Sequence, residues 1–341
     1  MTATSVPSVQ RPIVHTRYGA VRDVLELSEG MPVRAPGQRE VQVCVRASSI
    51  NPIDWQMIEG NRRLISRRRF PFTPLFDLAG VVTAVGDGVT SFRVGDRVHA
   101  DNETGGGGGA EYVNVREGLL APVPAGVGFA EAAAIPLAAQ TALTCLDSAQ
   151  VTAGTRVAVI GASGGVGHCV VQLAHSVGAF VVGATSTRNL GFVHMLGADE
   201  VIDRTTTDLV SRFGPASFDV VIDTAGGIEQ WVRARHVLRP GGRFVTIARD
   251  EDGAVTPASA TRLLATISAR RIRGTGTRGV KYVPVFLKAS GPLLRRVDAF
   301  VESGDARVHI ARTFPLTVEG VNAAIDESRL GLSVGKLVLT R

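Results

Sequence analysis

Cysteine is scarce in this chain of 341 residues, which contains only Cys44, Cys145 and Cys169. They are far apart, odd in number and set among apolar neighbours, so their spacing indicates neither a disulfide framework nor a zinc cluster. Buried free thiols are typical of a reducing compartment, and we therefore predict a cytoplasmic protein.

Features of membrane, secreted and nucleic-acid-binding proteins are also missing. No apolar stretch reaches the roughly 18 residues of a membrane span, and the first residues lack the apolar core of a signal peptide. The formal charge of +6, from 37 basic and 31 acidic residues, is mild for this length. We expect a small-molecule substrate and neither a membrane nor a nucleic acid as partner. One local excess is the arginine cluster at 62, 63, 67, 68 and 69.

The length instead fits two globular domains, since one domain typically has roughly 100–200 residues. From Arg11 to about Pro124 the sequence predicts short strands between turns, and residues 41–45 alternate apolar and polar side chains. Five consecutive glycines at 105–109 predict a mobile loop, because glycine holds regular structure poorly.

After about Phe129 the pattern changes to helices and then to alternating strands and helices. Residues 131–150 predict a helix interrupted at Pro136. The alternation predicts a parallel, doubly wound α/β sheet. Its predicted strands are 156–160, 179–184, 219–222 and 242–247, and its predicted helices include 168–177 and 189–196. Near the end we expect helices at 293–303 and 318–328 and strands at 306–311 and 335–340.

The strongest motif follows the first of these strands, where residues 161–167 read Gly-Ala-Ser-Gly-Gly-Val-Gly. It matches the dinucleotide-binding fingerprint with Ala162 in place of the first glycine. In that fingerprint the first small residue makes the tight turn, Gly164 admits the pyrophosphate, and Gly167 lets helix and strand pack closely. The phosphates then lie at a helix N-terminus, which favours anions. The context favours a bound dinucleotide over an ordinary glycine-rich turn. The residues expected to hold it are Ala162, Ser163, Gly164, Gly165, Val166 and Gly167.

The end of the second strand distinguishes NAD from NADP. NAD-binding chains place an acid there for the ribose 2′-hydroxyl, but residues 183–189 contain none. Thr185 and Ser186 offer hydroxyls and Arg188 a guanidinium, which suit a 2′-phosphate. We therefore predict NADPH as cofactor. The alternative is that Arg188 only begins the next helix in solvent.

Motifs in order along nearly the whole chain resemble the medium-chain dehydrogenase/reductase superfamily. They include Asn51-Pro52-Ile53-Asp54, Asp77-Leu78-Ala79-Gly80, Val94-Gly95-Asp96-Arg97-Val98, Leu196-Gly197-Ala198-Asp199, Pro240-Gly241-Gly242 and Gly335-Lys336-Leu337-Val338-Leu339. The resemblance implies a GroES-like, mostly β catalytic domain at 1–130, a Rossmann domain at 131–284, and a return to the catalytic domain at 285–341. It also implies an active site between the domains and a homodimer.

The same resemblance bears on zinc. Zinc alcohol dehydrogenases of this family carry Cys at the position of Asn51, Gly-His-Glu at 75–77, and a further Cys near 140–141. Neither Asn51 nor Phe76 suits zinc, and three cysteines cannot form the four-cysteine structural lobe. We therefore predict no metal, as in the quinone oxidoreductase-like branch. Without zinc, hydride delivery to a quinone or an α,β-unsaturated carbonyl is easier than alcohol oxidation.

The candidate catalytic residues are Asn51, Asp54 and Asp77. Asn51 is suited to donate a hydrogen bond to a substrate carbonyl or to the cofactor, whereas the simpler interpretation of the two acids is structural. None of the three tyrosines matches an acid position, so solvent would supply the proton. The residues expected near the nicotinamide are Thr141, Asp223, Thr224, Ala225 and Ile247.

Three positions carry further hypotheses. Lys336 is either a charge near the cofactor or a solvated lysine before a strand. Leu75, where the family usually has Gly, and Phe76 would add bulk beside Asn51 in the substrate pocket.

Three functions stay open at this point. The first is an NADPH-dependent quinone or enone reductase. The second is an enoyl-thioester reductase or biosynthetic tailoring enzyme, in which the arginines between Arg62 and Arg69 hold an acidic substrate instead of forming a solvated basic loop. The third is a non-catalytic NADPH-binding sensor, because a fold alone does not settle function.

Overall fold

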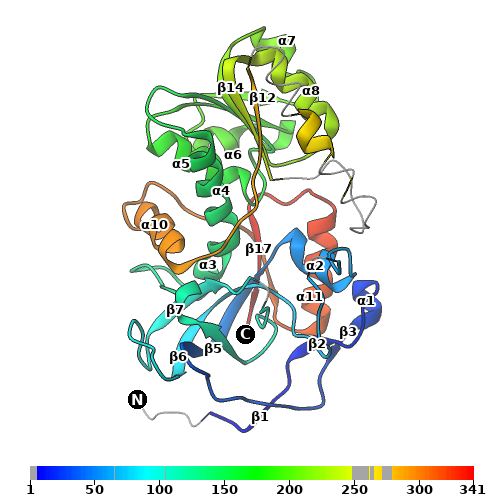
Figure 1. Ribbon diagram of the computed structural model, residues 1–341, viewed down its shortest axis with the longest axis vertical. Helices are drawn as coiled ribbons and strands as arrows, with labels where there is room; N and C mark the ends of the chain where they lie inside the picture. Colours follow the sequence, from blue (N-terminus) through cyan, green and yellow to red (C-terminus); the bar gives the residue numbers. More distant parts are fainter. Residues whose placement is uncertain (1–5, 65, 104, 248–260, 262–264, 271–278) are drawn as a thin grey trace. The chain divides into compact units, whose positions relative to one another are not determined.

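The structure is a computed structural model that describes residues 6–64, 66–103, 105–247, 261, 265–270 and 279–341 (Figure 1). The chain divides into two compact units. The β unit comprises Met1–Leu137, Lys288–Glu302 and His309–Arg341, and the α/β unit comprises Ala138–Leu287 and Ser303–Val308.

The β unit is built on a seven-stranded sheet in the order β16-β17-β5-β6-β7-β9, with β8 pairing to β5. Its strands are β5 (Glu40–Ile50), β6 (Asp77–Val85), β7 (Arg97–Asp101), β8 (Tyr112–Arg116), β9 (Ala121–Pro122), β16 (Ile310–Pro315) and β17 (Lys336–Thr340). The smaller strands are β1 (Val9–Gln10), β2 (Ile13–His15), β3 (Leu25–Leu27) and β4 (Met31–Pro32). Its helical elements are α1 (Val21–Val24), α2 (Pro52–Ile58), η1 (Glu117–Leu119), α3 (Phe129–Ala134), α10 (Gly291–Glu302) and α11 (Val318–Arg329). The last strand, β17, pairs antiparallel with β5, with Leu337 opposite Ile50 (Figure 1).

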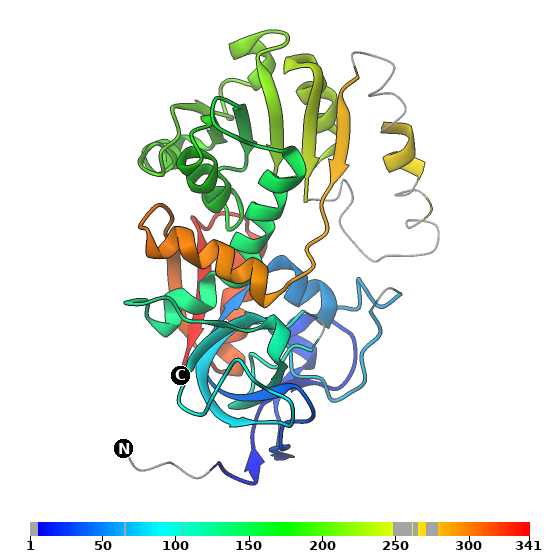
Figure 2. The same ribbon diagram turned by 60° about the vertical axis from the view of Figure 1, so that its left-hand side comes forward.

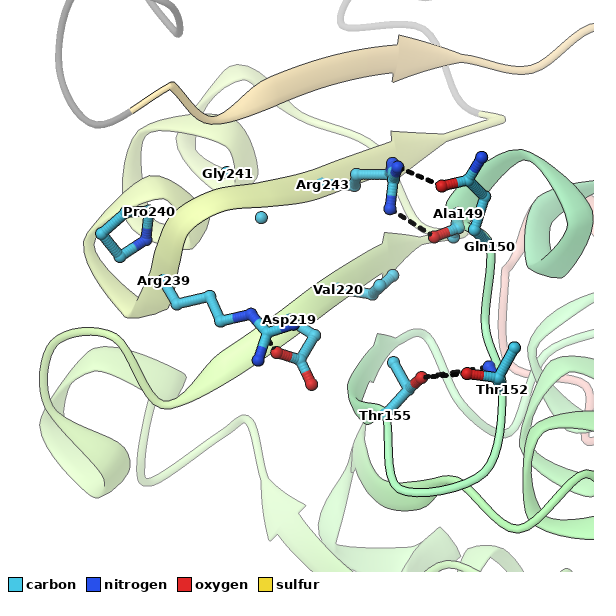
Figure 3. Close-up of a pocket in the computed structure, with 11 residues that line it drawn as sticks. Ala149, Gln150, Thr152, Thr155, Asp219, Val220, Arg239, Pro240, Gly241 and Arg243 are labelled. Atoms are coloured by element: carbon cyan, nitrogen blue, oxygen red, sulfur yellow. Dashed lines mark hydrogen bonds and ion pairs between the residues drawn. The ribbon is translucent and has the colours of Figure 1, made fainter.

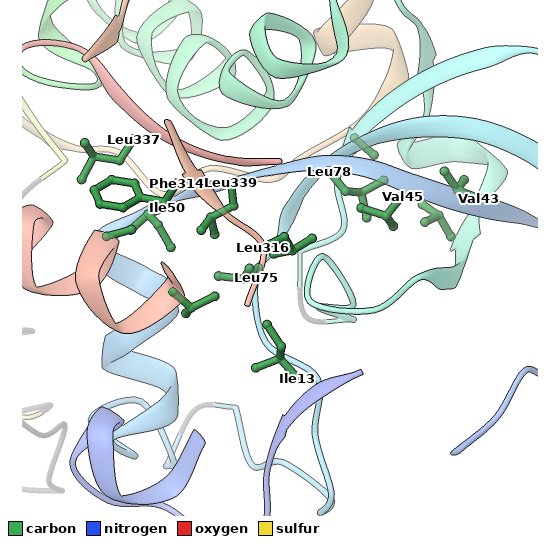
Figure 4. Close-up of a cluster of buried hydrophobic side chains, with 14 of the residues drawn as sticks. Ile13, Val43, Val45, Ile50, Leu75, Leu78, Phe314, Leu316, Leu337 and Leu339 are labelled. Atoms are coloured by element: carbon green, nitrogen blue, oxygen red, sulfur yellow. The ribbon is translucent and has the colours of Figure 1, made fainter. Parts of the chain in front are cut away.

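One apolar cluster fills the interior of this unit (Figure 4). Val43 and Val45 of β5 and Leu78 of β6 are fully buried in it, as period-two alternation requires. Leu75 also lies in this cluster, fully buried, with a φ of 71° that favours glycine. Burial of its side chain offsets the backbone strain.

The glycine loop at 105–109 corrects an expectation. Gly106 to Gly109 are buried, and the N–H groups of Gly107, Gly108 and Gly109 donate to carbonyl oxygens of residues 73–75. A Cβ at Gly108 would lie 2.4 Å from Ser48 Oγ. The prediction of a mobile loop was wrong, because the missing side chains let this backbone pack closely inside the unit.

The α/β unit is a six-stranded, wholly parallel sheet in the order β12-β11-β10-β13-β14-β15. Its strands are β10 (Arg156–Ile160), β11 (Phe180–Thr185), β12 (Glu200–Asp203), β13 (Phe218–Asp223), β14 (Leu238–Thr246) and β15 (Lys281–Pro284). Its helices are α5 (Gly167–Ser176), η2 (Thr187–Asn189), α6 (Leu190–Met195), α7 (Leu209–Phe213) and α8 (Ile228–Val237), and most of α4 (Pro136–Ala149) belongs to it. The helices lie on both sides of the sheet (Figures 1 and 2). The predicted doubly wound sheet is confirmed.

Most predicted elements are confirmed within a few residues, including the helix break before Pro136. The strand predicted at 306–311 was wrong for most of its length, because the observed strand β16 begins at Ile310. Its pairing with β17, Ile310 opposite Lys336, sets the boundary. Strands β12 and β15 were not predicted.

A cavity of about 230 Å³ lies in the α/β unit where β10 and β13 begin (Figure 3). Arg239 pairs with Asp219 on its wall, and Arg243 donates to the Ala149 carbonyl at 3.0 Å and to Gln150. Parallel sheets bind ligands at the carboxyl ends of their strands. This cavity lies at the opposite edge and is not the candidate site.

Cys44, Cys145 and Cys169 form no disulfide, and Cys145 and Cys169 are buried. Within the described ranges, no helix is both long enough and apolar enough to cross a bilayer.

Candidate functional site

The glycine-rich turn joins β10 to α5. Gly161 has a φ of 79°, and a Cβ there would lie 2.7 Å from Thr224 Oγ1. A Cβ at Gly167 would overlap the carbonyl oxygen of Gly161, so the close approach of helix and strand depends on glycine. The tight turn was predicted at Ala162, but it is made by Gly161, because only glycine adopts this φ readily. Ala162 is fully buried behind it.

The outer side of this turn fits a pyrophosphate. A Cβ at Gly164 would meet only the Gly161 carbonyl oxygen, at 3.3 Å, so the backbone there is open to close approach. Among the described residues, the backbone N–H groups of Gly165 and Val166 have no recorded acceptor. Donors of this kind at a helix N-terminus bind anions.

The end of β11 is tied to the turn by side chains. Thr185 Oγ1 donates to Ser163 Oγ at 2.8 Å, and Asn189 Nδ2 donates to the same oxygen at 3.0 Å. Ser186 is half-buried and Arg188 is exposed at the start of η2. Thr185 therefore stabilises the turn, which leaves Ser186 and Arg188 as the better candidates for a 2′-phosphate.

Asp203 is an acid that the sequence reasoning missed. It ends β12 opposite Thr185 of β11 in the parallel register. Its carboxylate accepts hydrogen bonds from Thr187 Oγ1 at 2.6 Å and from Thr205 N at 2.9 Å and Oγ1 at 2.6 Å, and these bonds lower its pKa. The dinucleotide-binding fingerprint predicts such an acid only at the end of β11, whereas Asp203 lies at the end of the neighbouring strand β12. The sequence did offer one signal for this acid. The four residues that end at Asp203 directly follow the motif Leu196-Gly197-Ala198-Asp199, and they form strand β12.

The residues predicted near the nicotinamide gather at the carboxyl ends of β13 and β14. Asp223 is buried, and its Oδ1 accepts the N–H groups of Ala225 at 3.0 Å and Gly226 at 2.9 Å. Thr224 Oγ1 donates to the Ile160 carbonyl oxygen at 2.8 Å, beside the glycine turn. Ile247 N donates to the Asp223 carbonyl oxygen at 3.3 Å. Thr141 is buried on α4 of the same unit.

In the β unit, Asp54 joins the start of α2 to the loop before β6. Its carboxylate accepts the N–H of Asn51 at 2.7 Å and the N–H of Phe76 at 3.1 Å. Burial raises the pKa of Asp54 to about 7, and the negative charge of Asp77 adds to this, while the two N–H donors and Lys336 oppose it.

Asp77 and Lys336 complete this network. Asp77 Oδ2 accepts hydrogen bonds from Asn51 Nδ2 at 2.7 Å and from Ser49 Oγ at 2.8 Å, and it lies 3.5 Å from Lys336 Nζ. Lys336 Nζ donates to the Ile50 carbonyl oxygen at 3.0 Å and to Asn51 Oδ1. Lys336 is 3% exposed, so the alternative of a solvated lysine was wrong.

Asp101 is the second acid that the sequence reasoning missed. It ends β7 directly opposite Asp77 of β6 and is buried. Burial raises its pKa well above the usual range, and the charge of Asp77 adds to this. Three buried carboxyl groups, those of Asp54, Asp77 and Asp101, therefore interact at this end of the sheet, with the Lys336 ammonium beside Asp77.

The proposed substrate residues Phe76 and Leu75 have different surroundings in the structure. Phe76 is buried, and the Arg68 guanidinium lies 5.6 Å from its ring centre and 4.6 Å from that of Phe72. Leu75 lies in the apolar core of the β unit (Figure 4). Its extra bulk relative to glycine therefore fills the core and does not line an open pocket.

The arginines of the cluster at 62–69 differ in their surroundings. Arg62 donates to Gln56 Oε1 at 3.1 and 2.7 Å, and Arg68 is buried. Arg63, Arg67 and Arg69 are exposed, and no ion pair is recorded for them among the described residues. In the same ranges, no group of three or more His, Cys, Asp or Glu side chains is arranged to hold a metal ion.

Comparisons with known proteins identify the family. Residues 37–125 match the alcohol dehydrogenase GroES-like domain, and residues 196–339 match the family described as zinc-binding dehydrogenase. The chain is 33% identical to a 2-methylene-furan-3-one reductase of Solanum lycopersicum over 347 aligned positions, covering 99% of this chain and 81% of the relative. It is 32% identical to a chloroplastic NADPH-dependent alkenal/one oxidoreductase of Arabidopsis thaliana, covering 98% and 80%.

A solved structure agrees. The quinone oxidoreductase from Coxiella burnetii superposes with a TM-score of 0.81 at 26% identity, covering 98% of this chain and 99% of that one. The chain belongs to the medium-chain dehydrogenase/reductase superfamily, in its quinone oxidoreductase-like branch. It is an oxidoreductase that uses a nicotinamide cofactor, and the alternative of a non-catalytic sensor has no support in these findings.

Proposed function

We propose that this protein transfers a hydride from NADPH to a quinone or an α,β-unsaturated carbonyl without zinc. The observation that carries the proposal is the pair of side chains that stands in the β unit where related dehydrogenases have zinc ligands. The positions that hold zinc ligands in related dehydrogenases are Asn51 and Phe76, and Asn51 is hydrogen-bonded to Asp77 and Lys336. An amide and a phenyl ring do not suit zinc, whereas an amide N–H suits a carbonyl oxygen.

NADPH is the proposed cofactor, and when bound it supplies the hydride. The turn from Ala162 to Gly167 would hold its pyrophosphate, because the backbone at Gly164 is open to close approach. Ser186 and Arg188 would hold the 2′-phosphate, with Thr185 fixing the turn. The NADPH-dependent relative from Arabidopsis thaliana supports this choice. Residues proposed near the nicotinamide are Thr141, Asp223, Thr224, Ala225 and Ile247.

Asn51 would polarise the substrate carbonyl by donating a hydrogen bond, and Phe76 would supply an apolar wall. A single donor of this kind is adequate because a quinone or enone is already electrophilic. Asp54 and Asp77 hold Asn51 in place, and solvent supplies the proton. The relatives named as alkenal/one and quinone oxidoreductases support this substrate class.

Other features stay predictions. They are the cytoplasmic location, the homodimer, and the division into catalytic residues 1–130 and 285–341 and cofactor-binding residues 131–284.

A second candidate function is reduction of an enoyl thioester. The observation that favours it is the exposure of Arg63, Arg67 and Arg69, since no acidic side chain is recorded to pair with them in the described ranges. Guanidinium groups of this kind bind phosphates well. A phosphate-bearing thioester would then be preferred over a simple enone.

A panel assay tests both candidates. NADPH consumption by purified protein is measured with a benzoquinone, a naphthoquinone, a simple enone and an enoyl thioester, each repeated with NADH. Turnover of a quinone or enone, with NADPH preferred, is the expected result. Turnover of the thioester alone would favour the second candidate, and NADH preferred throughout would contradict the cofactor assignment.

A further inference from the structure

The ammonium of Lys336 is surrounded by groups of the protein itself. An ammonium has three N–H groups, and three acceptors surround this one: the Ile50 carbonyl oxygen at 3.0 Å, Asn51 Oδ1, and Asp77 Oδ2 at 3.5 Å. The pairing of β17 with β5, which sets Leu337 opposite Ile50, brings Lys336 to this place. The ammonium is therefore directed into the protein, toward two hydrogen-bond acceptors and one carboxylate.

These charges also fix the side-chain amide of Asn51. Its Oδ1 accepts from the Lys336 ammonium, and its Nδ2 donates to the Asp77 carboxylate at 2.7 Å. A flipped amide would set its NH₂ against the ammonium and its oxygen against the carboxylate, and both contacts would be repulsive. Asn51 is 3% exposed, so water cannot readily replace these partners.

One N–H of the Asn51 amide is then left over. Nδ2 carries two N–H groups, and its recorded acceptor among the described residues is Asp77 alone. We propose that Lys336 and Asp77 are positioning residues, which fix the Asn51 amide so that it presents an N–H and never its oxygen to the ligand. The ligand atom must then be a hydrogen-bond acceptor, and the carbonyl oxygen of the quinone or enone fits. This role rests on the proposed function and replaces the predicted role of Lys336 as a charge near the cofactor.

A double-mutant cycle between Asn51 and Lys336 tests this role. The variants are Asn51→Ala, Lys336→Met and their combination, with Lys288→Met, at an exposed lysine, as matched control. Lys336→Met leaves Asp77 without its cation, so Lys336→Met with Asp77→Asn provides a variant with balanced charge if the single variant does not fold. Each protein is measured for kcat and KM with a naphthoquinone and for NADPH affinity by fluorescence titration.

We expect the variants at Lys336 and Asn51 to lose catalytic efficiency and to keep their affinity for NADPH. Lys336→Met and Asn51→Ala each lower kcat/KM by about 10- to 100-fold, and the combination loses no more than the larger single loss, because both remove one oriented donor. NADPH affinity stays within about threefold of the wild type. Lys288→Met matches the wild type in both measurements.

Three outcomes would overturn the inference. Losses that multiply in the combined variant would mean that Lys336 acts independently of Asn51. A tenfold or larger loss of NADPH affinity in Lys336→Met or Asn51→Ala would mean that these side chains act on the cofactor. Unchanged kcat/KM in Lys336→Met would remove the positioning role. If the wild type reduces no quinone or enone, the proposed function fails, and the NADPH titration still decides whether Lys336 contacts the cofactor.

Discussion

Replacing Asp54 with Asn removes a buried carboxyl group that accepts the N–H groups of Asn51 and Phe76. The folded pKa of this group is about 7, and its ordinary value is 3.8. Between these values the folded protein keeps the proton that the unfolded chain releases. The free energy of unfolding therefore falls as pH rises through this window and levels off above it.

The size of this effect follows from the pKa difference. At about 1.4 kcal/mol for each pKa unit, the wild type loses about 4 kcal/mol of stability between pH 4 and pH 7 because of Asp54. The Asn variant cannot show this loss. The Asn side chain lowers the free energy of unfolding by about 1–3 kcal/mol at every pH, because its NH₂ faces one of the two N–H groups and leaves that donor unsatisfied. Between pH 4 and pH 7, the free energy of unfolding of the variant should therefore rise by about 4 kcal/mol relative to that of the wild type.

Urea unfolding at several pH values measures the difference. Trp55 is next to Asp54 and Trp231 lies in the α/β unit, so a Trp231→Phe background in both proteins makes fluorescence report on the β unit. Titrating groups far from Asp54 are common to the two proteins and cancel in the comparison, whereas the pKa of Asp101, which the charge of Asp54 helps to raise, falls in the variant. A stability difference that stays constant with pH, or that moves against the variant at high pH, would refute the reasoning.

Four further outcomes are expected. Arg188→Asp should weaken NADPH binding at least tenfold more than NADH binding in fluorescence titrations; equal losses would contradict the 2′-phosphate assignment. Gly167→Ala should lower stability by about 1–3 kcal/mol in thermal unfolding, because its Cβ overlaps the turn's carbonyl oxygen. Gly164→Ala should cost less stability than Gly167→Ala and lose NADPH affinity, since its Cβ would lie 3.3 Å from the Gly161 carbonyl oxygen without overlapping it; the reverse pattern would contradict the roles given to these glycines. Exchange of the exposed Arg67 and Arg69 for Gln should raise KM for an enoyl thioester severalfold and leave KM for a simple enone unchanged, and an unchanged thioester KM would exclude the cluster from substrate binding.

Local patterns in the sequence were sufficient to predict most of the fold. Strands β10, β11, β13 and β14 were found because each is an apolar run bounded by turns, and the glycine motif after β10 identified the binding turn. The boundary of β16 was not predictable from its own residues, since pairing with β17 decides where it begins. The glycines at 105–109 were misjudged because close packing and mobility have the same sequence signature.

The candidate site was predictable where a short motif carries it. Asn51, Asp54 and Asp77 were named from two motifs, and the structure brings them together through hydrogen bonds. Asp101 and Asp203 were missed because strand register, which a single sequence does not reveal, brings each to its place.

Turnover by metal-free protein tests the central claim most directly. Purified enzyme is dialysed against a chelator, its zinc content is determined by mass spectrometry, and NADPH-dependent reduction of a naphthoquinone and an enone is then measured. We predict full turnover with far less than one zinc per chain. Loss of turnover on chelation, with recovery when zinc is added back, would contradict it.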